Sequence, residues 1–466
     1  MPQSLATLLT LAFIAVLFIR DLRGKPNVTG ALWLPFFWIV VGPGSRFLSQ
    51  WLDIFGFHVG GITVEDGSPI DATFYAALIA MGMFVLYKRR VSIREFIGNN
   101  RWLTIFLAYC LVAVLWSDFP FVSLKRWIKL LGDPVMALVI LTEPDVIESL
   151  TVLIKRAAYV MLPVSILFIK YYPDLGRLYD TWTGAQMNTG IATNKNELGF
   201  DCWIIGAVLL WHMAQVFHRE PGRGKRNEMM LCGGLMVMDL WLLKTAHSAS
   251  PFVALILGAG IMLFLGLRWV RKERVSAYIL MALIVCTVAG AGLGLFGGII
   301  HLLGRNETFT GRTDIWTMLW HWNINPAVGA GFEGFWLGDR REAVEDLYPG
   351  LNEAHNGYLE TYLNLGIVGV LITVAMLLAT YGKCRRELFR NFDWGRFRMA
   401  YLFSFIVYNW TEASFRLNAL PFFIFFLIAI NYPKRQTAVA PEVEEAGEVL
   451  FTNGVVNGSL PKVFLQ

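Results

Sequence analysis

Residues 301–336 read HLLGRNETFTGRTDIWTMLWHWNINPAVGAGFEGFW, and residues 353–366 read EAHNGYLETYLNLG. The region from the first segment to the second is the longest polar stretch between apolar runs, and it holds three of the seven histidines. It is also rich in arginines, carboxylates and tryptophans. Because the rest of the chain is mostly apolar, we expect any chemistry to take place in this stretch.

The composition is that of a membrane protein. Of the 466 residues, 56% are hydrophobic and only 16% are charged, whereas about 25% are charged in an ordinary soluble domain. The net charge of +5 is typical of basic cytoplasmic loops, so we expect membrane lipid and no nucleic acid as a partner. The five cysteines show neither disulfide nor metal spacing, which favours a role in helix packing.

Apolar runs long enough to cross a bilayer, which needs about 20 residues, recur along the chain. They lie near 4–19, 31–49, 69–87, 102–117, 127–142, 152–170, 197–217, 230–247, 250–269, 276–300, 363–382, 398–413 and 418–432. This pattern predicts an all-α integral membrane protein with about 12–13 transmembrane helices. It also predicts one large extracytoplasmic loop that contains short amphipathic helices.

The same pattern divides the chain into four segments. They are N-terminal transmembrane helices over 1–300, an extracytoplasmic catalytic loop over 301–362, C-terminal transmembrane helices over 363–432 and a disordered cytoplasmic tail over 433–466. The tail is assigned as disordered because it is polar and poor in residues that could form a core.

The loops sort by charge, and this sets the expected orientation. Basic connections occupy every second loop, at 20–25, 88–94, 218–226, 268–274 and 383–390. We therefore expect these loops in the cytoplasm, the N-terminus outside and the 301–362 loop on the extracytoplasmic side. The loop at 142–148 is the weakest point of this alternating pattern. It should also be cytoplasmic, but it carries no lysine or arginine.

His355 is the first candidate for chemistry. Asn352 is predicted to cap a helix whose first turn contains Glu353 and His355. The positive end of that helix would disfavour imidazolium, so His355 would be mostly neutral and able to accept a proton. Glu353 acts in the opposite direction, so the sequence leaves the net effect open. The alternative is an interfacial histidine that only bonds to its neighbours.

Arg312 is the second candidate. Thr313 or Asp314 is predicted to cap a short helix with a tryptophan-rich face that includes Trp316 and Trp320, and Arg312 would stand at its N-terminus. A guanidinium beside free backbone N–H groups suits a phosphate. The alternative is an arginine that binds lipid headgroups at the same boundary.

Other basic residues stand at outer span boundaries, namely Lys195, Arg126 and Arg416. A single residue of this kind usually reaches from the bilayer toward the headgroups. With Arg312 on the same side, however, they could form a basic pocket for a polyanionic lipid head.

Several motifs are missing from the sequence. It has no Asp-x-Asp pair, no Walker A loop, no His-Glu-x-x-His site and no Gly-x-Ser-x-Gly turn. We therefore predict neither a metal nor a cofactor.

Several segments resemble the signature of one membrane protein family, the O-antigen ligases and polymerase-like proteins, which includes exopolysaccharide polymerisation proteins. The segments are WSDFPFVSLKRWIKLLGDP, TNKNELG, HSASPFVALIL, GRTDIW, NPAVGAGFEGFW and EAHNGYLETYLNLGIVG. They occur in the family's order, and with the span pattern the resemblance extends over roughly residues 100–432.

The resemblance implies an inverting, metal-independent glycosyltransferase at the periplasmic face of the bacterial inner membrane. The donor would be an oligosaccharide linked to undecaprenyl pyrophosphate, and the acceptor a glycan or lipid-linked hydroxyl. By position, His355 matches the family's proposed general base and Arg312 its pyrophosphate-binding arginine. Lys195 and Arg126 match further basic positions, and Arg416 adds to the pocket. Two glutamates could orient His355, and we favour Glu353 over Glu360.

Three alternatives remain open. A polymerase would join repeat units and could act with polysaccharide export machinery, whereas a ligase would transfer glycan to lipid A-core; we favour the polymerase. A transporter of lipid-linked sugars would need charges deep within spans, where Asp239 and Lys244 are the few candidates. A structural partner of an export complex would tolerate loss of His355 and Arg312.

Overall fold

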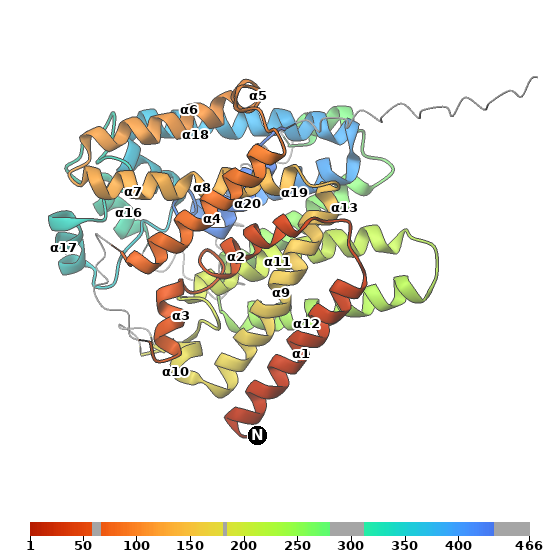
Figure 1. Cartoon of the computed structure of the whole chain (residues 1–466). Coiled ribbons are helices and arrows are strands. Elements are labelled where there is room, and N and C mark those ends of the chain that lie inside the picture. Colours follow the sequence, from red (N-terminus) through yellow and green to blue (C-terminus); the bar gives the residue numbers. More distant parts are fainter. Residues whose placement is uncertain (58–66, 180–183, 280–311, 433–466) are drawn as a thin grey trace, which may run out of the picture. The chain divides into compact units, whose positions relative to one another are not determined.

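A computed structural model describes residues 1–57, 67–179, 184–279 and 312–432 (Figure 1). The chain divides into two units, 1–432 and 433–466, and only the first contains described residues. Three predicted features lie wholly or mostly outside the described residues. They are the tail 433–466, the start of the polar loop at 301–311 and most of the span at 276–300.

The described residues are predominantly helical with almost no strand, which confirms the predicted all-α membrane class. The helices are α1 (Gln3–Arg23), α2 (Trp33–Val40), α3 (Leu48–Ile54), α4 (Pro69–Lys88), α5 (Ile93–Asn99), α6 (Arg101–Val112), α7 (Pro120–Leu130), α8 (Gly132–Leu141), α9 (Val146–Tyr171), α10 (Pro173–Gly176), α11 (Lys195–Phe217), α12 (Arg223–Thr245), α13 (Ala249–Gly266), α16 (Arg312–Trp320), α17 (Gly338–Leu347), α18 (Gly357–Arg390), α19 (Phe392–Thr411) and α20 (Leu420–Ala429). Short 3₁₀ turns cover Gly30–Leu32, Ala113–Trp116 and Lys272–Arg274. Two strands, β1 (Arg177–Tyr179) and β2 (Gln186–Asn188), pair antiparallel.

Six described helices are long and apolar enough to cross a membrane, namely α1, α4, α9, α11, α13 and α18. A seventh crossing exists if α5 and α6, which meet at a bend of 105°, form one broken span. The described residues therefore contain fewer candidate spans than the predicted 12–13. Some predicted runs form short helices, α12 and α19 are long but not among the candidate spans, and the run at 276–300 lies mostly outside the described residues. The helices α8 and α20 have ten residues each and extend about 15 Å, half the thickness of a bilayer core.

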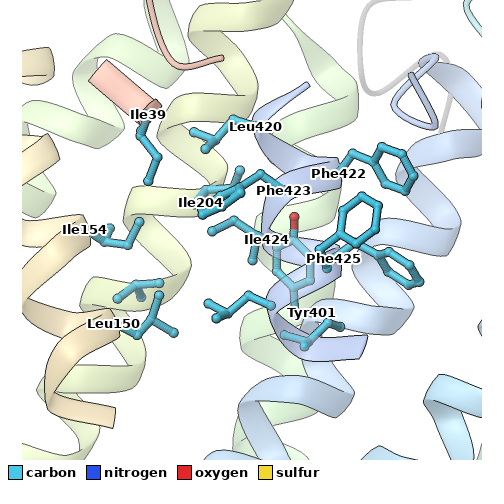
Figure 2. Packing of buried hydrophobic residues seen from close by; sticks show 14 of the residues in the cluster. Ile39, Leu150, Ile154, Ile204, Tyr401, Leu420, Phe422, Phe423, Ile424 and Phe425 are labelled. Atoms are coloured by element: carbon cyan, nitrogen blue, oxygen red, sulfur yellow. The ribbon is translucent and has the colours of Figure 1, made fainter. Parts of the chain in front are cut away.

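Helix α20 forms the centre of the core. Its sequence, LPFFIFFLIA, is apolar on every side, and all ten residues are buried. It packs against α8, α11, α18 and α19, and Figure 2 shows its phenylalanines among side chains of neighbouring helices. Two cations bind the negative end of the helix, because Arg398 donates to Ile428 O at 2.8 Å and Lys383 donates to Ala429 O at 2.7 Å.

A break in α18 anchors the polar loop. Gly366 lies inside this helix with a φ of 63°, so the backbone N–H groups after it turn toward the NPAVGAG segment. Ile367 N donates to Pro326 O at 2.9 Å, and Val368 N donates to Ala327 O at 3.1 Å. A Cβ on Gly366 would lie only 2.3 Å from the carbonyl of Ala327. The helix break and the loop therefore need glycine at this position.

The acidic loop at 142–148 lies against the basic loops. Glu143 forms an ion pair with Arg89 at the start of the basic loop 88–94, and Glu148 accepts a hydrogen bond of 3.1 Å from Asn27 N. Arg89, from a neighbouring loop, supplies the positive charge that this loop itself lacks. The loop therefore lies at the same end of the helices as the basic connections.

Candidate active site

Five charged side chains of alternating sign form a continuous chain at the start of α18. Arg416 Nη1 lies 2.7 Å from Glu353 Oε2, and Glu353 Oε1 lies 2.8 Å from His355 Nδ1. His355 Nδ1 lies 3.6 Å from Glu412 Oε2. Glu412 Oε1 then accepts a hydrogen bond of 2.9 Å from Arg312 Nη2. The structure thus brings four predicted site residues, Arg312, Glu353, His355 and Arg416, into one cluster.

His355 precedes a helix instead of lying inside it. Helix α18 begins at Gly357, and its cap is Asn356, whose side chain accepts hydrogen bonds from two backbone N–H groups of the first turn. The prediction that Asn352 caps this helix is therefore wrong by four residues. Two asparagines, Asn352 and Asn356, precede the apolar run, and either can cap a helix. The sequence pattern alone therefore does not decide between them.

The electrostatics of the cluster favour a charged His355. Burial disfavours the imidazolium, but Glu353 and Glu412 outweigh burial and raise the pKa of His355 to about 9. Burial also acts against the charge of Glu353, yet Arg416 and His355 lower the pKa of Glu353 to about 2. The sequence left open whether the helix terminus or Glu353 sets the charge of His355, and in this arrangement the adjacent carboxylates favour the imidazolium.

Arg312 is the first residue of α16, as predicted, and it is buried. Thr313 and Asp314 lie inside the first turn, so neither is the predicted cap. Besides Glu412, Arg312 donates to the carbonyl of Thr411. One guanidinium thereby connects α16 to the end of α19.

The two tryptophans of the predicted α16 face contact the loop and α18, although Trp320 stays exposed. Trp316 Nε1 donates to Ala354 O at 2.9 Å, directly before His355. Trp320 stacks on Tyr362 of α18, with ring centroids 4.8 Å apart. These contacts fix the position of Arg312 relative to His355.

A cavity of about 430 Å³ adjoins the cluster through Arg416. Its charged lining consists of Arg126, Arg341, Arg416, Glu197, Glu333 and Glu360. Arg126 comes from α7 and donates to Glu333 O at 2.6 Å. The predicted site residues Arg126 and Arg416 therefore line the same cavity. The sequence alone could not show that they lie close together.

Glu360 organises the loop and does not orient His355. It is buried, and its carboxylate accepts hydrogen bonds from Trp336 Nε1 at 2.6 Å, Ala354 N at 2.9 Å and Asn364 Nδ2 at 3.0 Å. Glu353, the residue that we favoured from sequence, lies 2.8 Å from His355 Nδ1, and its role in orienting His355 stays a prediction.

Lys195 begins α11, as expected, after the cap Asn194. Its side chain forms no ion pair with any residue in the described ranges, and it is absent from the charged lining of the cavity. Its neighbour Asn196 instead donates to Glu412 Oε2 at 3.2 Å. The structure therefore brings Asn196, and not Lys195, to the cluster.

Three non-glycine residues at the site have left-handed backbones, namely Glu333 (φ 51°), His355 (φ 48°) and Asn418 (φ 62°). This conformation is uncommon outside glycine and costs on the order of 1–3 kcal/mol per residue. Such strain persists where surrounding contacts fix the backbone, and Glu333 Oε1 indeed accepts a hydrogen bond of 3.0 Å from Leu417 N. Three further residues with positive φ, Lys25, Arg90 and His247, lie elsewhere in the described residues.

Sequence reasoning missed Glu412, Glu333 and Arg341. Glu412 is the most central of them, since it contacts Arg312 and His355 and accepts a hydrogen bond of 3.3 Å from Ser250. A signal was present, because Glu412 stands four residues before Arg416 at the outer end of an apolar run. A carboxylate at such a boundary needs a cationic partner.

The described residues thus define a helical membrane protein with a charged, cavity-lined site at one end of its helices. Residues 234–374 match the family model for O-antigen ligase, and this match supports the resemblance of the chain to the O-antigen ligase and polymerase-like family. The match covers less than half of the chain and includes Arg312, Glu353 and His355, whereas Glu412 and Arg416 lie beyond it. No curated protein matches the sequence. The family supports a glycosyltransferase type of activity on lipid-linked glycans.

Proposed function

We propose that this protein transfers a glycan from undecaprenyl pyrophosphate to a hydroxyl acceptor at the periplasmic face of the inner membrane, without a metal, and that it polymerises exopolysaccharide or O-antigen repeat units. The observation that carries the proposal is the alternating chain from Arg416 to Arg312 beside the cavity. Its two ends are cations, which suits a diphosphate with its charge spread over two groups.

The arginines supply the charge stabilisation that the reaction needs. As the glycosidic bond to phosphate breaks, negative charge grows on the lipid diphosphate, and fixed cations lower the barrier. Arg312 and Arg416 are paired with Glu412 and Glu353, so the diphosphate binds by competing with these carboxylates. Ligand atoms of Glu353, His355 and Glu412 lie within 4.8 Å of one another, but a metal ion there would face two guanidinium groups.

The acceptor proton needs a base. In the transfer, the acceptor oxygen bonds to the anomeric carbon, the bond from that carbon to the diphosphate oxygen breaks, and the hydroxyl proton leaves. Because Glu353 and Glu412 raise the pKa of His355, we assign proton acceptance to Glu353, whose carboxylate is released when the diphosphate takes Arg416. The imidazolium of His355 then orients Glu353 and faces the diphosphate.

The pH profile of transfer tests this assignment. If a neutral imidazole were the base, the rate would fall below a pKa of about 9. If the Glu353 carboxylate is the base, the acidic limb lies well below neutral pH. A rate that falls between pH 9 and pH 7 would return the role of base to His355.

The test of function uses a strain that lacks the protein. We expect single lipid-linked repeat units to accumulate and the polymer to disappear, and we expect neither His355→Asn nor Arg312→Lys to restore the polymer. Accumulation of long lipid-linked polymer that is missing from its final acceptor would instead establish a ligase.

One observation favours the transporter as a second candidate. Asp201 is buried in α11, its two carboxylate oxygens have no hydrogen-bond partner in the described part of the chain, and Asp239 is fully buried in α12. Acidic residues deep within spans often mark ion or proton pathways. If the deletion strain accumulates lipid-linked glycan that external enzymes cannot reach, the transporter is supported and the transferase is excluded.

A further inference from the structure

A second polar cavity lies far from the cluster around His355. It has a volume of about 460 Å³ and is lined by residues of α1, α9, α11 and α12, among them Lys155, His212 and Glu228. His212 lies about 25 Å further along α11 than Lys195. The proposed glycan transfer makes no use of this cavity.

Three side chains beside this cavity converge on one carboxylate oxygen. His212 Nε2 lies 3.0 Å from Glu228 Oε1, and Cys232 Sγ lies 3.8 Å from the same oxygen. The ammonium of Lys155 also contacts it. Glu228 and Cys232 are four residues apart on α12 and therefore share one face, which is turned toward His212 on α11.

We propose that His212, Glu228 and Cys232 bind a divalent transition metal of the zinc type. Zinc bonds to nitrogen, oxygen and sulfur are about 2.0–2.3 Å long, so tetrahedral ligands lie about 3.3–3.7 Å apart. The observed separations of 3.0 and 3.8 Å bracket this range, and all three ligand atoms lie within 4.8 Å of one another. Imidazole, thiolate and carboxylate together suit zinc better than magnesium or calcium.

Lys155 is the competitor of the metal. Its ammonium contacts Glu228 Oε1, whereas Arg20 Nη2 lies 3.4 Å from the other oxygen, Oε2, and can stay there. The metal takes the place of the ammonium at Oε1 while Lys155 moves toward Asp145 and Glu148, which line the same cavity. Binding converts the Cys232 thiol to a thiolate and releases its proton to solvent. The adjoining cavity has room for water as a fourth ligand. The metal would join α11 to α12 and would have no part in glycan transfer.

The experiment measures metal binding directly. The full chain, purified in detergent without a polyhistidine tag and stripped with a chelator, is titrated with Zn²⁺ against a chromogenic chelator and separately with Co²⁺. We expect one saturable site per chain, release of about one proton per metal and a thiolate-to-cobalt absorption band. His212→Gln and Cys232→Ala should each weaken binding at least about 100-fold, and Cys232→Ala should remove the band.

Two further variants keep the test decisive. Cys384→Ala removes another buried cysteine and should leave binding and the band unchanged. Lys155→Gln should strengthen binding because it removes the competing ammonium. A chain that binds no Zn²⁺ at one equivalent, or one in which Cys232→Ala binds like the unaltered protein, would overturn the proposal and leave Glu228 as an ion-pair centre.

Discussion

Arg312 and Glu412 are 100 residues apart in the sequence and form a buried ion pair, with 2.9 Å between Nη2 and Oε1. Arg416 and Glu353 form a second such pair at 2.7 Å. In both pairs, one partner comes from the polar loop before α18 and the other from the segment after α19. The site is therefore assembled from two segments, and the family match covers only the first.

Glu412→Gln should abolish most transfer. The substitution removes the charge shared by Arg312 and His355, leaves a buried guanidinium without its anion, and should destabilise the protein by about 3–5 kcal/mol. We would measure polymer output together with thermal unfolding in detergent. Glu342→Gln is the control, because Glu342 is exposed on α17; equal activity of the two variants would contradict the central place of Glu412.

Stability should depend on pH through His355. Its pKa is raised from 6.5 to about 9, so its ion pairs stabilise fully below pH 6.5, and this stabilisation is lost as pH rises through 9. Thermal unfolding temperatures across this range should fall more steeply for the unaltered protein than for His355→Asn. Asparagine tolerates the left-handed backbone of His355, so parallel curves would contradict the raised pKa.

The stability of the protein at acidic pH should depend on Glu353. Its pKa is lowered from 4.5 to about 2, so its contribution is present above pH 4.5 and is lost as pH falls toward 2. Glu353→Gln should therefore flatten the acidic limb of the stability curve, and it should also weaken the alkaline limb because Glu353 is the main cause of the raised pKa of His355. An unchanged acidic limb would show that other carboxylates dominate acid unfolding.

Arg312→Lys should lose activity by about 100-fold or more. Arg312 donates to both Glu412 and Thr411, and an ammonium cannot reproduce the planar fork that makes two such bonds and also contacts phosphate. The measurement is polymer output at equal membrane level. Arg341→Lys, in the lining of the cavity, is the comparison variant, because it tests the effect of charge alone. Full activity of Arg312→Lys would show that Arg312 acts only by charge attraction.

Gly366→Ala should destabilise the protein, although alanine usually favours helices. The added Cβ would lie 2.3 Å from the Ala327 carbonyl, and the φ of 63° disfavours any L side chain. Gly382→Ala in the same helix meets nothing within 4 Å and should leave stability the same or slightly higher. Equal unfolding temperatures for the two variants would contradict the docking of the loop onto α18.

Local patterns in the sequence predicted the helical class, the start of α11 at Lys195 and the position of Arg312. They did not predict protonation, because the pKa of His355 depends on a balance of burial, Glu353 and Glu412, and neither burial nor the approach of Glu412, 57 residues further along the chain, is visible in a local pattern. These patterns also could not distinguish a helix that spans the membrane from a short buried helix, since α20 is as apolar as any span. The ion pair between Arg416 and Glu353 is a tertiary contact, and no periodic pattern in the sequence predicts such a contact.

The shortness of α20 also bears on biogenesis. A ten-residue apolar segment is below the length that membrane insertion recognises as a span, so α20 enters its position by packing against helices that are already inserted. Glu412 and Arg416 lie in the connection that leads into it. We therefore expect the charged half of the site to form late, and we expect a core substitution such as Phe425→Ala to yield full-length, inserted protein that lacks the ion pair between Arg312 and Glu412.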